Sequence, residues 1–199
     1  MQVAPVEQVS DAEMVYGVAV ALGSTLYRVS MDVSDVDRSV YENLSFRVAC
    51  HPSESEERLV ARILAYGLLY EPGLEFGKGV SDADEPALWA HDLTGRLLHW
   101  IDVGTPGADR IHTASKRAER VSIVCHKGAH ALGREMQRRK VHRAKEIQVL
   151  LPEPDLIAKL ARALERKSEW TLLHTEGVLN VTIQSQTFSG TLLRIPLPQ

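Results

Sequence analysis

Alternating polar and apolar positions predict two β-strands near the start of the chain. The first alternation covers residues 25–33 and the second covers residues 42–49, and the turn-rich segment Ser34-Asp35-Val36-Asp37-Arg38 lies between them. Two strands joined in this way form a hairpin. We therefore expect a β-hairpin on the N-terminal side of the folded domain.

A helix is predicted after this hairpin. Ser53 and Glu56 have the spacing of a capping box, and apolar side chains then recur at helical spacing. Glu57 lies one turn before this apolar stripe, so we expect its side chain to point toward the core. Pairing of Glu57 with Arg58 or Arg62 at the domain edge is the alternative. The stripe consists of Val60, Leu64 and Leu68.

The rest of the chain alternates between strand and helix patterns. Strands are predicted at residues 74–76, 97–103, 120–126 and 146–151, helices at residues 86–89, 108–119, 129–143 and 154–164, and two or three strands after Trp170, with a turn at Glu176-Gly177. This order predicts an α/β (α+β) fold in which helices flank a mixed β-sheet.

The composition is that of one globular domain. A chain of 199 residues is long enough for one sizeable core. It has no apolar stretch of the roughly eighteen residues that a membrane span needs. The two cysteines lack CxxC spacing, which disfavours a zinc site or a disulfide framework. Acidic rather than basic residues precede the apolar run 15–22, so we expect no signal peptide and a cytoplasmic location.

The net charge of −3 conceals a strong asymmetry along the chain. Residues 1–109 hold seven Lys/Arg and 18 Asp/Glu, whereas residues 110–145 hold 11 Lys/Arg and two Glu. A basic segment behind an acidic one suits an enzyme that holds a phosphate backbone and presents a metal to it, so nucleic acid is the expected partner. A solvated helix face is the alternative explanation.

Two acidic clusters are the main candidates for chemistry. Asp84 and Glu85 precede Pro86, and Asp102 stands within the otherwise apolar strand predicted at 97–103. A buried carboxylate is costly unless a basic partner, a hydrogen-bond network or a bound cation compensates it. Two such clusters on neighbouring elements suggest a Mg²⁺ site.

These residues resemble the YaeQ family of small bacterial proteins. The resemblance covers the chain from about Ser24 to its end, and residues 1–23 are interpreted as an extension or a misassigned start before a single domain at 24–199. The residues that carry it are His51-Pro52-Ser53-Glu54 with Glu57-Arg58 and Arg62, Asp84-Glu85-Pro86 with Trp89, and Trp100-Ile101-Asp102 with Gly104, Pro106 and Arg110.

The resemblance implies a variant of the PD-(D/E)xK nuclease-like fold, with extra β-hairpins at the N- and C-terminal ends. In that superfamily carboxylates bind one or two Mg²⁺ (or Mn²⁺) ions. By position, Glu57 corresponds to the helix acid with Glu54 beside it, Asp84 or Glu85 to the first motif acid, and Asp102 to the second.

The sequence departs from the superfamily at the lysine that positions the attacking water. Gly104 stands two residues after Asp102, and Thr113 stands where the family as a whole has a lysine on the next helix. Lys116 lies one turn further along that helix, and Arg110 could supply the charge without acting as a base.

Three hypotheses follow. The first is a metal-dependent phosphodiesterase or nuclease that uses Asp84, Glu85, Asp102, Lys116 and Arg110 and holds nucleic acid through segment 110–145. The second is a non-catalytic nucleic-acid-binding or transcription-associated protein that keeps the fold and a vestigial metal site. The third makes the acids a structural network, with Asp102 accepting hydrogen bonds from Arg110.

Overall fold

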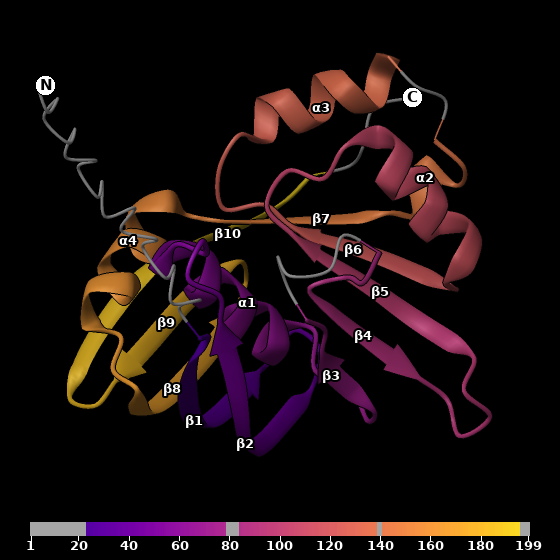
Figure 1. Ribbon diagram of the computed structural model, residues 1–199. Coiled ribbons are helices and arrows are strands. Elements are labelled where there is room, and N and C mark those ends of the chain that lie inside the picture. Colours follow the sequence, from indigo (N-terminus) through magenta and orange to yellow (C-terminus); the bar gives the residue numbers. More distant parts are fainter. Residues whose placement is uncertain (1–22, 79–83, 139–140, 196–199) are drawn as a thin grey trace, which may run out of the picture.

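A single mixed sheet organises the part of the chain that the structure describes. The computed structural model describes residues 23–78, 84–138 and 141–195, and within them ten strands and four α-helices are present (Figure 1). This confirms a mixed α/β architecture. Residues 1–22 of the expected extension, and Arg139 and Lys140 of the basic segment, lie outside the described residues.

The first and last strands form one half of the sheet. β1 (Thr25–Asp35) and β2 (Val40–Cys50) form the predicted hairpin. β8 (Lys167–Thr175), β9 (Val178–Ile183) and β10 (Gln186–Ile195) form an antiparallel meander with the predicted turn at Glu176-Gly177. β1 pairs with β8 in parallel, so both terminal hairpins belong to the same sheet as the core.

The middle of the chain forms the other half. β3 (Leu74–Phe76), β4 (Leu88–His91) and β5 (Leu97–Val103) are antiparallel, and β6 (Arg120–Val124) and β7 (Gln148–Pro152) continue in parallel with β5. β7 pairs antiparallel with β10 and joins the halves. The strand order is β2-β1-β8-β9-β10-β7-β6-β5-β4-β3.

The helix predicted at residues 86–89 is wrong, because this segment leads into strand β4. Leu88 and Ala90 are fully buried, and they pair with Ile101 and His99 of β5. Pairing with a central strand and burial outweigh the local helix-start signal of Pro86. The helix predicted at 129–143 also differs: α3 (Ala129–Arg138) is shorter, and a 3₁₀ turn at Ala144–Glu146 precedes β7.

Helix α1 (Glu56–Leu68) is enclosed rather than buried on one side. It packs against β1, β2, β5 and β6, and α4 (Pro154–Ala163) covers it from another side. Its N-cap is Ser55, whose hydroxyl accepts the Arg58 N–H at 3.3 Å, so the predicted cap at Ser53 is two residues early. The side chains with no exposure are Leu59, Val60, Ala61, Ile63, Leu64 and Ala65.

The half-sheet from β5 to β7 separates two apolar cores. Ile101 and Val103 belong to the larger core around α1 and α4, whereas Trp100 belongs to a smaller core with α2 (Ala108–Arg117) and α3. Successive strand residues point to opposite faces. Asp102 therefore faces the α2 side of β5, away from α1.

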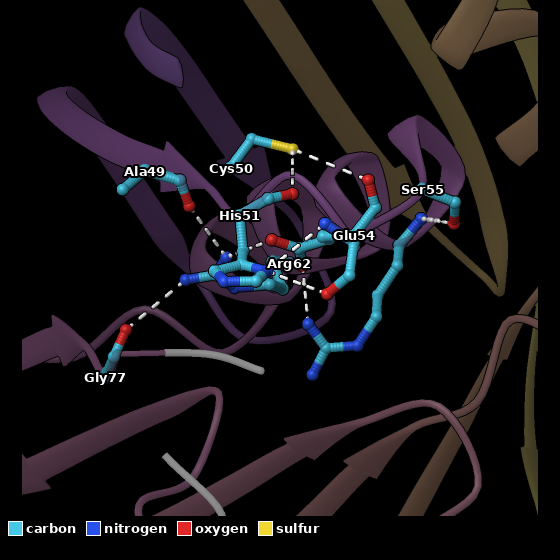
Figure 2. Close-up of polar contacts among 9 residues, drawn as sticks. Ala49, Cys50, His51, Glu54, Ser55, Arg62 and Gly77 are labelled. Atoms are coloured by element: carbon cyan, nitrogen blue, oxygen red, sulfur yellow. Dashed lines mark hydrogen bonds and ion pairs between the residues drawn. The ribbon is translucent and has the colours of Figure 1, made fainter. Parts of the chain in front are cut away.

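A buried arginine connects the two edge strands of this nearly closed sheet. The Arg62 guanidinium, 2% exposed, donates to the carbonyl of Ala49 at the end of β2 (3.1 Å) and to that of Gly77 just after β3 (3.4 Å) (Figure 2). Phe46 of β2 and Phe76 of β3 also have ring centroids 5.3 Å apart. The polar bridge and the aromatic contact hold both edges around α1.

Candidate functional site

The candidate residues gather at the carboxyl edge of the parallel strands β5, β6 and β7. The loop after β5 and the loop after β6 touch there, since the Gly104 N–H donates to the Val124 carbonyl at 2.9 Å. A Cβ on Gly128 would lie 3.0 Å from the Thr105 methyl group. Helices α2, α3 and α4 all start from this edge. In α/β sheets this edge is where ligands bind.

Asp102 is held by an arginine and a tryptophan. Its side chain is 7% exposed, and Arg110 in the first turn of α2 binds both carboxylate oxygens through Nε (2.9 Å) and Nη2 (2.8 Å). The Trp100 indole N–H donates to the same carboxylate at 3.0 Å. The Arg110 and Arg117 guanidinium groups lie 5.4 and 5.2 Å from the Trp100 ring centroid. The pairing is the one that the third hypothesis predicts.

The Asp84-Glu85 segment lies beside Asp102, as the motif spacing predicts. Arg110 Nη2 donates to the Glu85 carbonyl at 2.7 Å, so one guanidinium connects both acidic motifs. The Glu85 side chain itself turns to Lys78, binding the ammonium at 2.8 Å and the backbone N–H at 3.1 Å. Asp84 is exposed.

The two helix acids have exchanged the roles expected of them. Glu57 is one-third exposed and pairs with Lys127 in the loop after β6, and the Lys127 hydrogen bond lowers the pKa of this carboxyl. Glu54 is buried and binds Arg58 and Arg62, the partners expected for Glu57 (Figure 2). The predictions that Glu57 faces the core and that it pairs with Arg58 or Arg62 are therefore wrong.

Lys116 does not take the position of the missing motif lysine. Gly104 has φ +105° and open space around its Cα, and the Thr113 hydroxyl donates to the Asp109 carbonyl at 2.9 Å. Lys116 is exposed in the last turn of α2, six residues after Arg110 and so about 9 Å further along the helix axis. Arg110, not Lys116, lies next to Asp102.

The carboxylates as arranged do not fit a Mg²⁺ ion. Hard cations need oxygen atoms that converge on one point. Both oxygens of Asp102 are bound by N–H donors, and Glu57 lies on α1, on the other side of β5. Among the described residues, no group of three His, Cys, Asp or Glu side chains is arranged to hold a metal.

The basic segment 110–145 does not form one continuous positive face in its described part. Arg120 pairs with Glu71 at the opposite edge of the sheet, and Arg143 pairs with Glu146. Four cations are exposed and form no ion pair with the described residues: Lys116, Arg117, Arg134 and Lys145.

Sequence reasoning missed a cavity beside this edge. It measures about 400 Å³ and lies where β6 and β7 end and α3 and α4 begin. His126, 7% exposed, lines it, and its Nδ1 has no hydrogen-bond partner in the described structure. Burial lowers the pKa of His126, and nearby Lys127 and Arg58 lower it further. The available signal was a histidine that follows a buried strand, two residues before a glycine and a helix start.

Comparison with known proteins identifies the family of this chain. The family model described as YaeQ protein matches residues 20–192. The chain belongs to the YaeQ family. The uncharacterised protein YaeQ of Escherichia coli (strain K12) is 27% identical over 160 residues, which cover 80% of this chain and 88% of that protein. The YaeQ protein of Salmonella typhi is 33% identical over 106 residues, 53% of this chain and 59% of that protein.

Two solved YaeQ structures have the same fold. The YaeQ protein from Xanthomonas axonopodis pv. citri superposes with a TM-score of 0.81 at 29% identity, covering 88% of this chain and 99% of that one. The one from Pseudomonas syringae gives a TM-score of 0.79 at 36% identity, covering 86% and 96%. In this YaeQ chain, none of the described helices has the length and apolar character required to cross a membrane.

Proposed function

We propose that this YaeQ protein binds nucleic acid through its phosphates at the carboxyl edge of β5–β7, without hydrolysing it, on a nuclease-like fold. The observation that carries the proposal is the Asp102 carboxylate, whose two oxygens accept hydrogen bonds from Arg110 and Trp100. A protein cation stands where a metal-dependent hydrolase would need an ion.

Replacing this cation by Mg²⁺ would be unfavourable. The ion would have to displace Arg110 from both oxygens of Asp102, and the freed Arg110 would lose its bond to the Glu85 carbonyl as well. Mg²⁺ also gives up its own water reluctantly. The pair therefore favours a binding role over a hydrolytic one.

The same edge offers features that suit phosphate. Three helices start there, and neither α2 nor α4 has a side-chain cap. Helix N-termini present free N–H groups and a positive dipole end to anions. Lys127, whose side chain is 63% exposed, stands between them in the loop after β6. Glu57, Glu85 and Asp102 are each paired with a cation, and the Glu153 carboxylate before α4 accepts hydrogen bonds from Thr191.

A metal-dependent phosphodiesterase is the second candidate, and one contact favours it. Arg110 joins the Glu85 backbone carbonyl to the Asp102 carboxylate, so the backbone of the first acidic motif and the acid of the second contact one group. If Arg110 moved onto a substrate phosphate, Asp102 and the Asp84-Glu85 segment would be released together. This candidate predicts cleavage that needs Mg²⁺ or Mn²⁺.

Fluorescence anisotropy with a labelled oligonucleotide, as single strand and as duplex, tests the proposal. We expect affinity that falls steeply between about 50 and about 200 mM salt in EDTA, with Lys127→Ala lowering the salt slope by roughly 0.7 for a single strand. Lys167→Ala is the matched control, because Lys167 is an exposed lysine at the start of β8 and does not belong to the loops that follow β5, β6 and β7. Absence of binding would refute the proposal, and Mn²⁺-dependent cleavage that Asp102→Asn abolishes would establish the second candidate instead.

A further inference from the structure

The cavity at the start of α3 has a largely apolar wall. The main apolar contributors are Ala129, Leu151, Pro152, Pro154 and Leu193. A second cavity of about 440 Å³ continues along α3 and shares Ala129, Leu151 and Leu193 with the first. Leu193 is 59% exposed although it sits in this wall. The two cavities together have the size and the apolar lining of a small-molecule site.

Two residues that line this cavity have backbone N–H groups without a partner in the described structure. The N–H groups of Ala131 and Leu132 both donate to the Gly128 carbonyl, at 2.9 and 3.1 Å, so the internal hydrogen bonds of α3 start at Ala131. Ala129 and His130 precede that point, line the cavity and make no hydrogen bond through their N–H groups to the described residues. Such first-turn amides bind phosphate or carboxylate groups.

The cavity also holds one buried polar side chain that lacks a partner. His126 is more than nine-tenths buried, and burial lowers the pKa of its imidazole, which favours the neutral form. A neutral imidazole carries one donor and one acceptor. Its Nδ1 makes no bond within the described residues, which is unusual for a buried polar atom. A ligand with a donor–acceptor edge could pair with this ring.

We propose that this cavity is a nucleotide-binding subsite, in which the Ala129 and His130 amides bind a phosphate and the apolar wall and His126 bind the base of the same nucleotide. A free anion would leave the apolar wall and the neutral imidazole unused, and a purely apolar ligand would leave the amides and the imidazole unpaired. A nucleotide satisfies all three, because a base has an apolar face and a polar edge. The subsite deepens the proposed function and rests on it for the source of the nucleotide.

Isothermal titration with adenosine 5′-monophosphate, adenosine and inorganic phosphate tests the subsite. We expect the monophosphate to bind at least tenfold more tightly than either fragment. His126→Phe, which fills the ring position with an apolar side chain, and Leu193→Trp, which fills the exposed part of the wall, should each weaken it at least tenfold. Leu93→Trp and His142→Phe are the matched controls, because both residues are exposed outside the cavity and should leave binding unchanged.

The outcomes separate the subsite from the proposed function. Equal affinity for the monophosphate and inorganic phosphate, or unchanged binding in both His126→Phe and Leu193→Trp, would overturn the subsite. If an oligonucleotide binds but an abasic oligonucleotide binds equally well, the subsite fails and the proposed function stands. If the monophosphate binds and no oligonucleotide does, the subsite stands and the nucleic-acid function fails.

Discussion

Removing Arg110 tests the central feature of the site, the pairing of Asp102 with a protein cation. Arg110→Met takes away both hydrogen bonds to Asp102 and the one to the Glu85 carbonyl. Of the described donors, it leaves the Trp100 N–H on a carboxylate of 7% exposure. Loss of one partner of a buried pair costs about 3–5 kcal/mol. Because Arg110 itself is 28% exposed, water can reach the vacated position, and we expect the lower end, about 3 kcal/mol.

Urea unfolding followed by tryptophan fluorescence measures this loss, since Trp100 and Trp170 are each 2% exposed in the folded protein. With a slope of about 2 kcal/mol per molar urea, the midpoint should fall by about 1.5 M. Asp102→Asn in the Arg110→Met background removes the unpaired charge and should recover more than half of that shift. Arg134→Ala, at an exposed cation that forms no ion pair with the described residues, is the control.

Urea unfolding of Arg110→Met in the presence of Mg²⁺ tests whether the freed carboxylate binds a metal. If the carboxylate freed in Arg110→Met binds Mg²⁺, an ion concentration of about ten times Kd would restore about 1.4 kcal/mol. We expect no such rescue, because among the described residues no group of three His, Cys, Asp or Glu side chains is arranged to hold a metal. A midpoint for Arg110→Met within about 0.3 M of the unsubstituted protein, or a double variant less stable than the single one, would refute the reasoning.

Three further predictions concern groups around the same edge. Arg62→Met should destabilise the fold by about 3–5 kcal/mol, because it removes the bridge between β2 and β3 and one of the two cations on buried Glu54. Arg62→Lys should retain only part of the lost stability. Equal urea midpoints for these two variants and the unsubstituted protein would contradict this prediction. The pKa of Glu57 is lowered in the folded protein, so its ionised form contributes stability above pH 4.5, and this stability is lost as pH falls through the folded pKa. Lys127→Met should therefore reduce the fall of the urea midpoint with decreasing pH below 4.5. An unchanged fall would count against the Glu57–Lys127 pair. The pKa of His126 is lowered in the folded protein, so the unfolded chain binds the proton more readily and stability should fall as pH drops below 6.5. His126→Phe should remove that loss of stability. An NMR titration in which the His126 ring of the folded protein titrates at or above pH 6.5 would contradict this prediction.

Local sequence signals predicted the fold where burial and local preference agree. The alternation at residues 25–33 became β1 because Val29, Met31 and Val33 point inward, and the stripe from Val60 to Leu68 became α1. Residues 86–89 failed because a proline signal competes there with a strand partner that lies far along the chain. The enclosure of α1 could not be predicted either, since it depends on β1 pairing with β8, more than a hundred residues away.

In the candidate site, the sequence indicated where the acidic residues lie but not which cation each of them binds. The two acidic motifs lie at one edge of the sheet, where Arg110 bonds both the Glu85 carbonyl and Asp102. What the acids do depends on which cation each one reaches, and this is set by the face of the strand and the turn of the helix. A shift of one turn makes Glu54, not Glu57, the partner of Arg58 and Arg62, and the alternation of β5 turns Asp102 toward α2.

The position of Arg110 distinguishes the two proposed activities, binding without hydrolysis and metal-dependent hydrolysis. While it stays on Asp102, the carboxylates are charge partners within the fold, and the helix termini and Lys127 remain as the groups that can meet an incoming phosphate. A phosphate that drew Arg110 away would leave Asp102 needing another cation in a site of low exposure. The affinity of Arg110→Met for an oligonucleotide should therefore be measured with and without Mg²⁺. It reports whether the bound phosphate contacts Arg110.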